Sequence, residues 1–319
     1  MERGPSMRTS GFYLGLALTL SCAPAAAQRS YASQLFQSLE EPGGITPPFM
    51  VPQTITVGKK YWQKVDFFQA GTAKPAPLVV FLNKGSSYLS MGSGAEQPNT
   101  ISFNGWPRAR MHEAGYAVAF VPFDRYLAKA GEMADYYASA IAYLRADASK
   151  LHIDPNRIIL IGVGFDAHFA ALLGTDPEYF EKAGVPFDSI RGVVSLWGTG
   201  FDIPLAYKQY SYADRDIART FGKDPDEQRH FSPVAHLDPP NAPAFLMLSG
   251  PNDTDSRRDS KVMADALAQA GIPVSNVDVA EHHRGDRKTY FMLEPDGNGR
   301  EIVPFLQAQF GDSDKGKTP

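Results

Sequence analysis

The sequence is nearly without cysteine. Its 319 residues contain a single one, Cys22, which lies among the first 27 residues. If that stretch is removed as an export signal, the mature chain has no thiol, which excludes disulfides, cysteine nucleophiles and cysteine-bound metals. Beyond residue 27 no apolar run approaches the roughly 18 residues that a membrane-spanning helix needs. No transmembrane segment is therefore expected.

The sequence also lacks any block of basic residues. It has 31 Lys and Arg against 35 Asp and Glu, a formal net charge of −4. A mildly acidic chain of this kind is a poor partner for nucleic acid, so no nucleic-acid ligand is expected. Hydrophobic residues make up 43% and charged residues 21%, which is typical of globular proteins. The length suffices for one large domain or two small ones.

The first 27 residues have the pattern of a secretory signal. Arg8 precedes a short apolar stretch over residues 11–20, and small residues then run to Ala27. This order predicts cleavage after Ala27 and an exported protein, periplasmic or secreted. The alternative is lipoprotein processing at Cys22, although Thr19 stands where such signals usually have leucine.

Strand and helix patterns alternate over most of the remaining chain. Residues 28–53 are polar and then rich in proline, which predicts a flexible N-terminal arm, and we expect residues 312–319 to form a disordered tail. Between them we expect one domain over 54–311, with a cap insertion at about 199–240, where no strand pattern occurs. Strands are expected at 65–68, 78–82, 116–121, 157–161, 191–196, 244–248 and 274–279, and helices at 131–149, 167–173, 257–270 and 299–310. Asp154, Pro155 and Asn156 predict a turn before the strand at 157–161. This alternation predicts an α/β fold with a doubly wound, mostly parallel sheet.

A sharp turn between a buried strand and a helix of small residues is the clearest motif. The strand that ends in Ile161 leads into Gly162, Val163 and Gly164, and a helix follows. In open α/β sheets, ligands bind at the carboxyl ends of the strands, where this turn lies. It has the context of a nucleophile elbow, whose pattern is Gly-x-Ser-x-Gly.

Several segments, taken in order, resemble the α/β-hydrolase superfamily. The resemblance is greatest to bacterial carboxylesterases of the lipase-like and arylformamidase-like type, and it covers almost all of residues 54–310. It is carried by the elbow together with YWQKVDFF at 61–68, AGYAV at 114–118, HIDPNRI at 152–158 and FSPV at 231–234. The resemblance implies the α/β-hydrolase fold, a Ser-His-Asp triad and no cofactor.

By this resemblance the catalytic triad is incomplete. The acid position is Asp253, and the histidine is His283 or its neighbour His282, in the chain order of the superfamily. The nucleophile position, however, holds Gly164, which has no side chain to acylate. In addition, Asp166 replaces the second glycine of the elbow.

The loop that should form the oxyanion hole departs from the family as well. The family has His-Gly-Gly-Gly there, whereas this chain has Asn83, Lys84, Gly85 and Ser86. Side chains stand where the loop needs bare backbone to bring its N–H groups near a substrate. We expect these residues to line an altered ligand pocket, together with Phe165 and Asp166.

Loss of two independent catalytic parts favours a catalytically impaired protein. It would bind a small acyl or ester-like ligand, or a partner, in the remaining cleft. The alternative is an active hydrolase in which His283 and Asp253 activate water, or in which Ser86 is a relocated nucleophile. A third reading is a structural or interaction protein. The oligomeric state is left open.

Simpler roles remain open for several of these residues. Asp253 could merely cap a helix, and His168 is more typical of a packing histidine than of a ligand. Asp166 should point away from the apex of the elbow. His282, His283 and Asp286 match no standard metal-site spacing, so no metal is expected.

Overall fold

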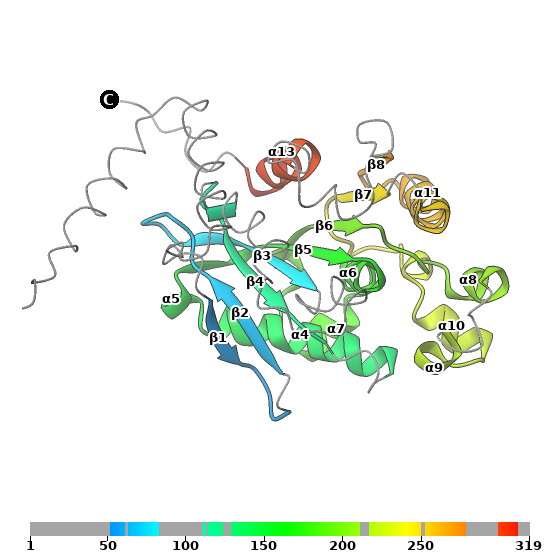
Figure 1. The fold of residues 1–319 in the computed structure, drawn as a ribbon, viewed down its shortest axis with the longest axis horizontal. Coiled ribbons are helices and arrows are strands. Elements are labelled where there is room, and N and C mark those ends of the chain that lie inside the picture. The colour runs from blue at the N-terminus through cyan, green and yellow to red at the C-terminus, as the bar shows by residue number, and fades with distance from the viewer. Residues whose placement is uncertain are drawn as a thin grey trace, which may run out of the picture. The chain divides into compact units, whose positions relative to one another are not determined.

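A single sheet organises the part of the chain that the computed structural model describes. This part comprises residues 52–60, 63–82, 111–112, 114–123, 129–210, 217–249, 253–278 and 299–311, all within the compact unit Phe49–Pro319. Its strands form one eight-stranded sheet in the order β1-β2-β4-β3-β5-β6-β7-β8 (Figure 1). The strands are β1 Gln53–Thr56, β2 Lys64–Phe68, β3 Ala76–Leu82, β4 Ala117–Val121, β5 Ile153–Val163, β6 Ile190–Leu196, β7 Phe245–Ser249 and β8 Val274–Asp278.

The sheet is parallel except at its amino-terminal edge. β1 pairs with β2, and β2 with β4, in antiparallel fashion; every other pair is parallel. Strands β3, β4 and β7 are buried at every residue. Strands covered on both faces read as continuous apolar runs, which is why the sequence revealed them. The predicted mostly parallel α/β sheet is confirmed.

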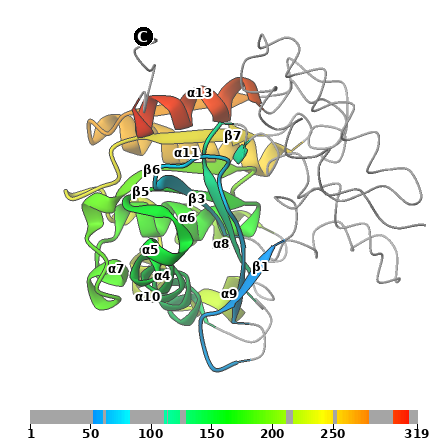
Figure 2. The same ribbon diagram turned by 90° about the vertical axis from the view of Figure 1, so that its left-hand side faces the viewer.

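Helices cover both faces of the sheet. Helices α4 and α13 lie on opposite sides of it (Figure 2). Buried residues of α4 and α6 pack in one core cluster, while α13 packs in a second cluster through Ile302, Leu306 and Phe310. The helices are α4 Ala130–Ala146, α5 Ala148–Leu151, α6 Phe165–Thr175, α7 Glu178–Lys182, η3 Phe187–Ser189, α8 Ile203–Gln209, α9 Ile217–Phe221, α10 Pro225–His230, η4 Pro233–Ala235, α11 Thr254–Gln269 and α13 Gly299–Phe310. This two-sided cover confirms the doubly wound architecture.

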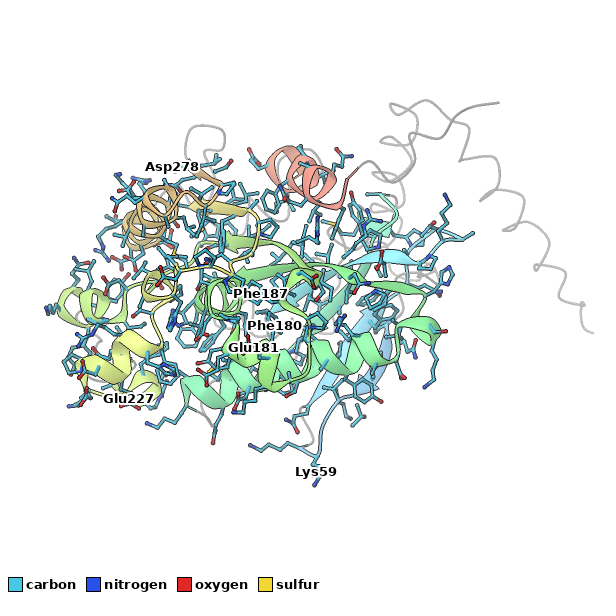
Figure 3. The ribbon with its side chains drawn as sticks, turned by 180° about the vertical axis from the view of Figure 1, so that it is seen from behind. Lys59, Phe180, Glu181, Phe187, Glu227 and Asp278 are labelled. Atoms are coloured by element: carbon cyan, nitrogen blue, oxygen red, sulfur yellow. The ribbon has the colours of Figure 1, made fainter. Side chains whose placement is uncertain are left out.

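Short helices fill the segment that the sequence marks as a cap. Within 199–240 the described residues form α8, α9, α10 and η4 and contribute no strand to the sheet. Outside this segment, Phe180 of α7 and Phe187 of η3, both labelled in Figure 3, have ring centroids 6.1 Å apart. None of the described helices combines the length and the apolar character needed to cross a membrane.

The turn predicted before the elbow strand is part of the strand itself. Strand β5 begins at Ile153 and therefore includes Asp154, Pro155 and Asn156. The Asn156 N–H donates to Asp154 Oδ1 at 3.0 Å, and the pairing with β3 shifts register there. The side-chain-to-backbone bond gives the turn pattern that the sequence shows. Residues 154–156 thus form a turn-like bulge inside β5, and the strand begins at Ile153, before the predicted start at residue 157.

Candidate functional site

The turn between β5 and α6 has the geometry of a nucleophile elbow. Strand β5 ends at Val163, Gly164 adopts φ 60° and ψ −120°, and α6 begins at Phe165. The Gly164 N–H donates to the Leu196 carbonyl oxygen at 2.7 Å, which ties the apex to β6. A side-chain-bearing residue is strained in this conformation and glycine is not. The backbone of the elbow is thus present without a nucleophilic side chain at its apex.

The first glycine of the elbow is required by close packing. A Cβ on Gly162 would lie 2.4 Å from the Ala167 Cα and 2.5 Å from the Asp166 carbonyl oxygen. Both neighbours are backbone atoms, which cannot move without moving α6. Gly162 therefore allows the helix to turn back tightly against the strand, as a sharp strand-to-helix turn demands.

Asp166, which replaces the second glycine, is directed to helix α4. The Tyr137 hydroxyl donates to Asp166 Oδ1 at 2.7 Å. Burial of the Tyr137 ring, followed by the charge of Asp166, raises the pKa of Tyr137 well above its usual value. The tyrosine therefore stays protonated and acts as a donor to the carboxylate. This places the carboxylate of a predicted pocket residue in a contact between α6 and α4.

Phe165 links the elbow to the cap. Its ring is half-buried and lies 5.5 Å from the ring of Phe169 and 6.1 Å from that of Phe221 in α9. Centroid distances of this size are typical of stabilising aromatic pairs. The residue after the apex is consequently held between its own helix and a cap helix.

Asp253, the predicted acid, stands at the first turn of α11. It is the N-cap residue, and its Oδ1 accepts the Ser256 N–H at 3.2 Å. A carboxylate there satisfies a helix N–H and complements the positive end of the helix dipole. Further along the same helix, Arg257 forms an ion pair at 2.7 Å with Asp278 at the end of β8. The capping role of Asp253 is thus observed.

Gly164 and Asp253 follow strands β5 and β7, which flank β6 and run parallel to it. Both residues therefore lie at the carboxyl edge of the sheet, where open α/β sheets bind ligands. The remaining predicted site residues lie outside the described residues: Asn83, Lys84, Gly85, Ser86, His282 and His283. The residues that the structure brings to one edge are the elbow and the acid position.

His168 is a buried packing residue. Its Nδ1 lies 2.8 Å from the Gly200 carbonyl oxygen, and its ring packs on Phe169 and Phe221 with centroid distances of 4.9 Å. Burial lowers the pKa of His168 to about 4. Because a carbonyl oxygen only accepts, Nδ1 carries the proton of the neutral ring. Among the described residues, no three His, Cys, Asp or Glu side chains gather so as to hold a metal ion.

Sequence reasoning missed a second buried polar residue, Asp259. It lies on α11, 6% exposed, and accepts the Gly200 N–H at 2.6 Å. The signal was available: Asp259 falls on the 3–4-residue repeat of Ser256, Met263 and Leu267, the buried face of the helix. A charged residue on such a face is paired in folded proteins.

The sequence matches a known family model over most of the described domain. Residues 66–267 match the model described as BD-FAE. Esterase LipC of Mycobacterium tuberculosis (strain ATCC 25618 / H37Rv) is 27% identical over 214 residues, which cover 60% of this chain and 47% of that protein. The chain thus spans about half the length of this curated relative.

Solved esterase structures share the fold. Esterase B from Lactobacillus Rhamnosis (HN001) superposes with a TM-score of 0.63 at 14% identity, covering 93% of this chain and 96% of that chain. Thermogutta terrifontis esterase 2 phosphonylated by sarin gives a TM-score of 0.60 at 16% identity, covering 82% and 94%. At these identities the likeness shows the fold, which is that of the α/β-hydrolases.

Proposed function

The chain belongs to the BD-FAE family and has the α/β-hydrolase fold of carboxylesterase-type proteins, and from this premise we propose that it is a catalytically impaired esterase. Its serine nucleophile is lost at Gly164. The remaining cleft binds a small acyl or ester-like ligand. Esterase ancestry supplies the cleft at the carboxyl edge of the sheet, and the missing side chain removes the covalent step.

The observation that carries this proposal is the conformation of Gly164. The apex keeps φ 60° and ψ −120° and its bond to β6, so the backbone that once presented a nucleophile is retained. Loss of the serine of such a triad costs on the order of 10⁶ in turnover and leaves roughly 10³–10⁴ over water from binding and oxyanion donors. A folded but feeble esterase is the expected result.

Turnover of short p-nitrophenyl esters tests the proposal. We would compare the wild-type protein with Gly164→Ser and with Gly164→Ala, which carries the same Cβ without a hydroxyl. The proposal expects a silent wild-type protein, a silent alanine variant and measurable hydrolysis by the serine variant. Binding is read separately, as a rise in melting temperature on addition of the corresponding p-nitroanilides.

The rival functions give different results in the same assay. Hydrolysis by the wild-type protein that is abolished by His283→Ala, but not by Ser86→Ala, would mean that the Asp253 and His283 pair activates water. Hydrolysis abolished by Ser86→Ala would mean a relocated nucleophile. A silent wild-type protein whose melting temperature no p-nitroanilide raises would favour a structural or interaction role. Each of these outcomes contradicts the proposal of a catalytically impaired, ligand-binding esterase.

We also propose that the protein is exported, with cleavage after Ala27. The support is the sequence pattern of the first 27 residues. Intact-mass measurement of the protein recovered from a bacterial host should give a chain that begins at Gln28. Cys22→Ser should leave that mass unchanged. A lipid adduct on Cys22, lost in the serine variant, would instead show lipoprotein processing.

A further inference from the structure

Asp259 is a buried carboxylate that three donors from separate places surround. Its Oδ2 accepts the Gly200 N–H at 2.6 Å and the Tyr210 hydroxyl at 2.5 Å. Its Oδ1 accepts Arg258 Nε at 3.1 Å. A buried carboxylate is tolerated only when it is paired and hydrogen-bonded in this way. All three contacts must therefore persist while the carboxylate stays buried.

The first donor belongs to the turn that follows β6. Gly200 is held from both sides, because its carbonyl accepts from His168 of α6 while its N–H binds Asp259 of α11. The same turn begins at Trp197, which has φ 53° and whose N–H donates to Leu248 of β7 at 2.7 Å. A bulky residue at positive φ persists only where its surroundings hold it. The turn is thus fixed between the helix of the elbow and the helix of the acid position.

The second donor belongs to the cap. Tyr210 is the C-cap residue that follows α8, and it is buried. The Arg258 guanidinium lies 5.0 Å above its ring and forms an ion pair with Asp255 at 3.2 Å. Arg258 therefore contacts both the Asp259 carboxylate and the ring of the tyrosine whose hydroxyl donates to that carboxylate.

We propose that Asp259 is a positioning residue that latches the cap and the β6 turn to helix α11. The N-cap residue of that helix is Asp253, about 9 Å from Asp259 at the usual rise of a helix. Because one carboxylate binds the turn, the end of α8 and Arg258, these pieces keep a fixed relation to the helix that begins at the acid position. This role does not depend on whether the site hydrolyses esters.

Hydrogen exchange at single amides tests the latch. Tyr210→Phe removes one hydroxyl and keeps the ring, and Tyr143→Phe, at an exposed tyrosine of α4, is the matched control. We expect Tyr210→Phe to speed exchange of the α8 amides and of the Gly200 amide about tenfold or more, since a hydrogen bond to a charged group is lost. The amides of β5 and β6 should keep their rates, and the control should change none.

A conservative change of the carboxylate separates positioning from general stability. Asp259→Asn keeps an oxygen acceptor for Gly200 and Tyr210 but loses the bond from Arg258, so it should preserve part of the protection that Asp259→Ala loses. The inference is overturned if Tyr210→Phe leaves α8 exchange unchanged. It is equally overturned if every amide of the sheet speeds up together with α8, or if Asn and Ala behave alike.

Discussion

The absence of a side chain at Gly164 has two consequences. Without a Cβ the apex of the elbow is free of strain at φ 60°, and without a hydroxyl it cannot form an acyl intermediate. Stability and catalysis therefore oppose each other at this residue. Active sites commonly hold residues in strained conformations for the sake of chemistry, and this chain has the unstrained alternative.

The effect of a side chain at position 164 on the free energy of unfolding can be measured. Gly164→Ala and Gly164→Ser should each lower the free energy of unfolding by about 1–3 kcal/mol, because either side chain must adopt the strained conformation. Urea denaturation gives the values. Gly184→Ala is the control for positive φ alone, since Gly184 has φ 71° and open space around a Cβ. An alanine at 164 that costs less than one at 184 would show that the apex is not strained.

Sequence reasoning placed Gly164 and Asp253 after the ends of strands but did not give the partners of their neighbours. The elbow is recognisable because a buried strand, a Gly-x-Gly turn and a helix follow each other within a few residues. The partner of Asp166, by contrast, is Tyr137, which lies 29 residues earlier on another helix. Such a contact depends on how α4 packs on α6, and no local pattern in the sequence encodes it.

At the scale of elements, α6 is held in place by polar contacts as well as by its apolar face. Tyr137 and Asp166 join it to α4. Tyr137→Phe and Asp166→Ala should each destabilise the protein by about 1–3 kcal/mol, since the first removes a hydrogen bond to a carboxylate and the second leaves the buried Tyr137 hydroxyl without this acceptor. A double-mutant cycle measured by urea unfolding should show a clear coupling between them. Strictly additive effects would mean that the contact contributes nothing to stability.

His168 joins α6 to the turn after β6, and we expect it to make the protein sensitive to acid. Its pKa is about 4 in the folded protein and 6.5 ordinarily. Between these values the unfolded chain binds a proton that the folded chain does not, so stability falls as the pH falls from about 6.5 to 4, by about 3 kcal/mol in all.

The acid sensitivity can be isolated with a variant that does not titrate. His168→Asn keeps an N–H donor for Gly200, and it should lose less stability than the wild-type protein over the same pH range. Chemical denaturation at several pH values gives both curves. Parallel curves for the two proteins would show that protonation of His168 does not oppose folding.

At the scale of the whole molecule, the sheet was largely predictable and its edge was not. Strands β3 and β4 are continuous apolar runs because helices or strands cover them on all sides. Strand β1 has the sequence QTIT and is mostly exposed, so it carries almost no apolar signal. It exists because β2 offers an unpaired edge, and only the assembled sheet provides that edge. The sequence therefore suggested an arm that reaches to residue 53, where the strand begins.

The cap and the site were also predictable only in part. A segment without strand pattern predicted an insertion between β6 and β7, while its attachment through Tyr210 and Asp259 depends on a contact across 49 residues. Sequence motifs indicate local structure, whereas buried polar contacts between distant elements can be identified only from the folded structure. The edge that carries Gly164 and Asp253 was predicted because the strand order of α/β folds follows general rules.

Loss of the nucleophile at Gly164, without a replacement elsewhere in the protein, is the property on which the proposed function depends most. An organophosphonate is a fitting probe, because the structurally similar esterase 2 of Thermogutta terrifontis is phosphonylated by sarin. Intact-mass measurement after exposure to a fluorophosphonate should show one adduct on Gly164→Ser and none on the wild-type protein or Gly164→Ala. A phosphonate adduct on the wild-type protein would contradict the central claim, because a serine other than residue 164 would then be the nucleophile.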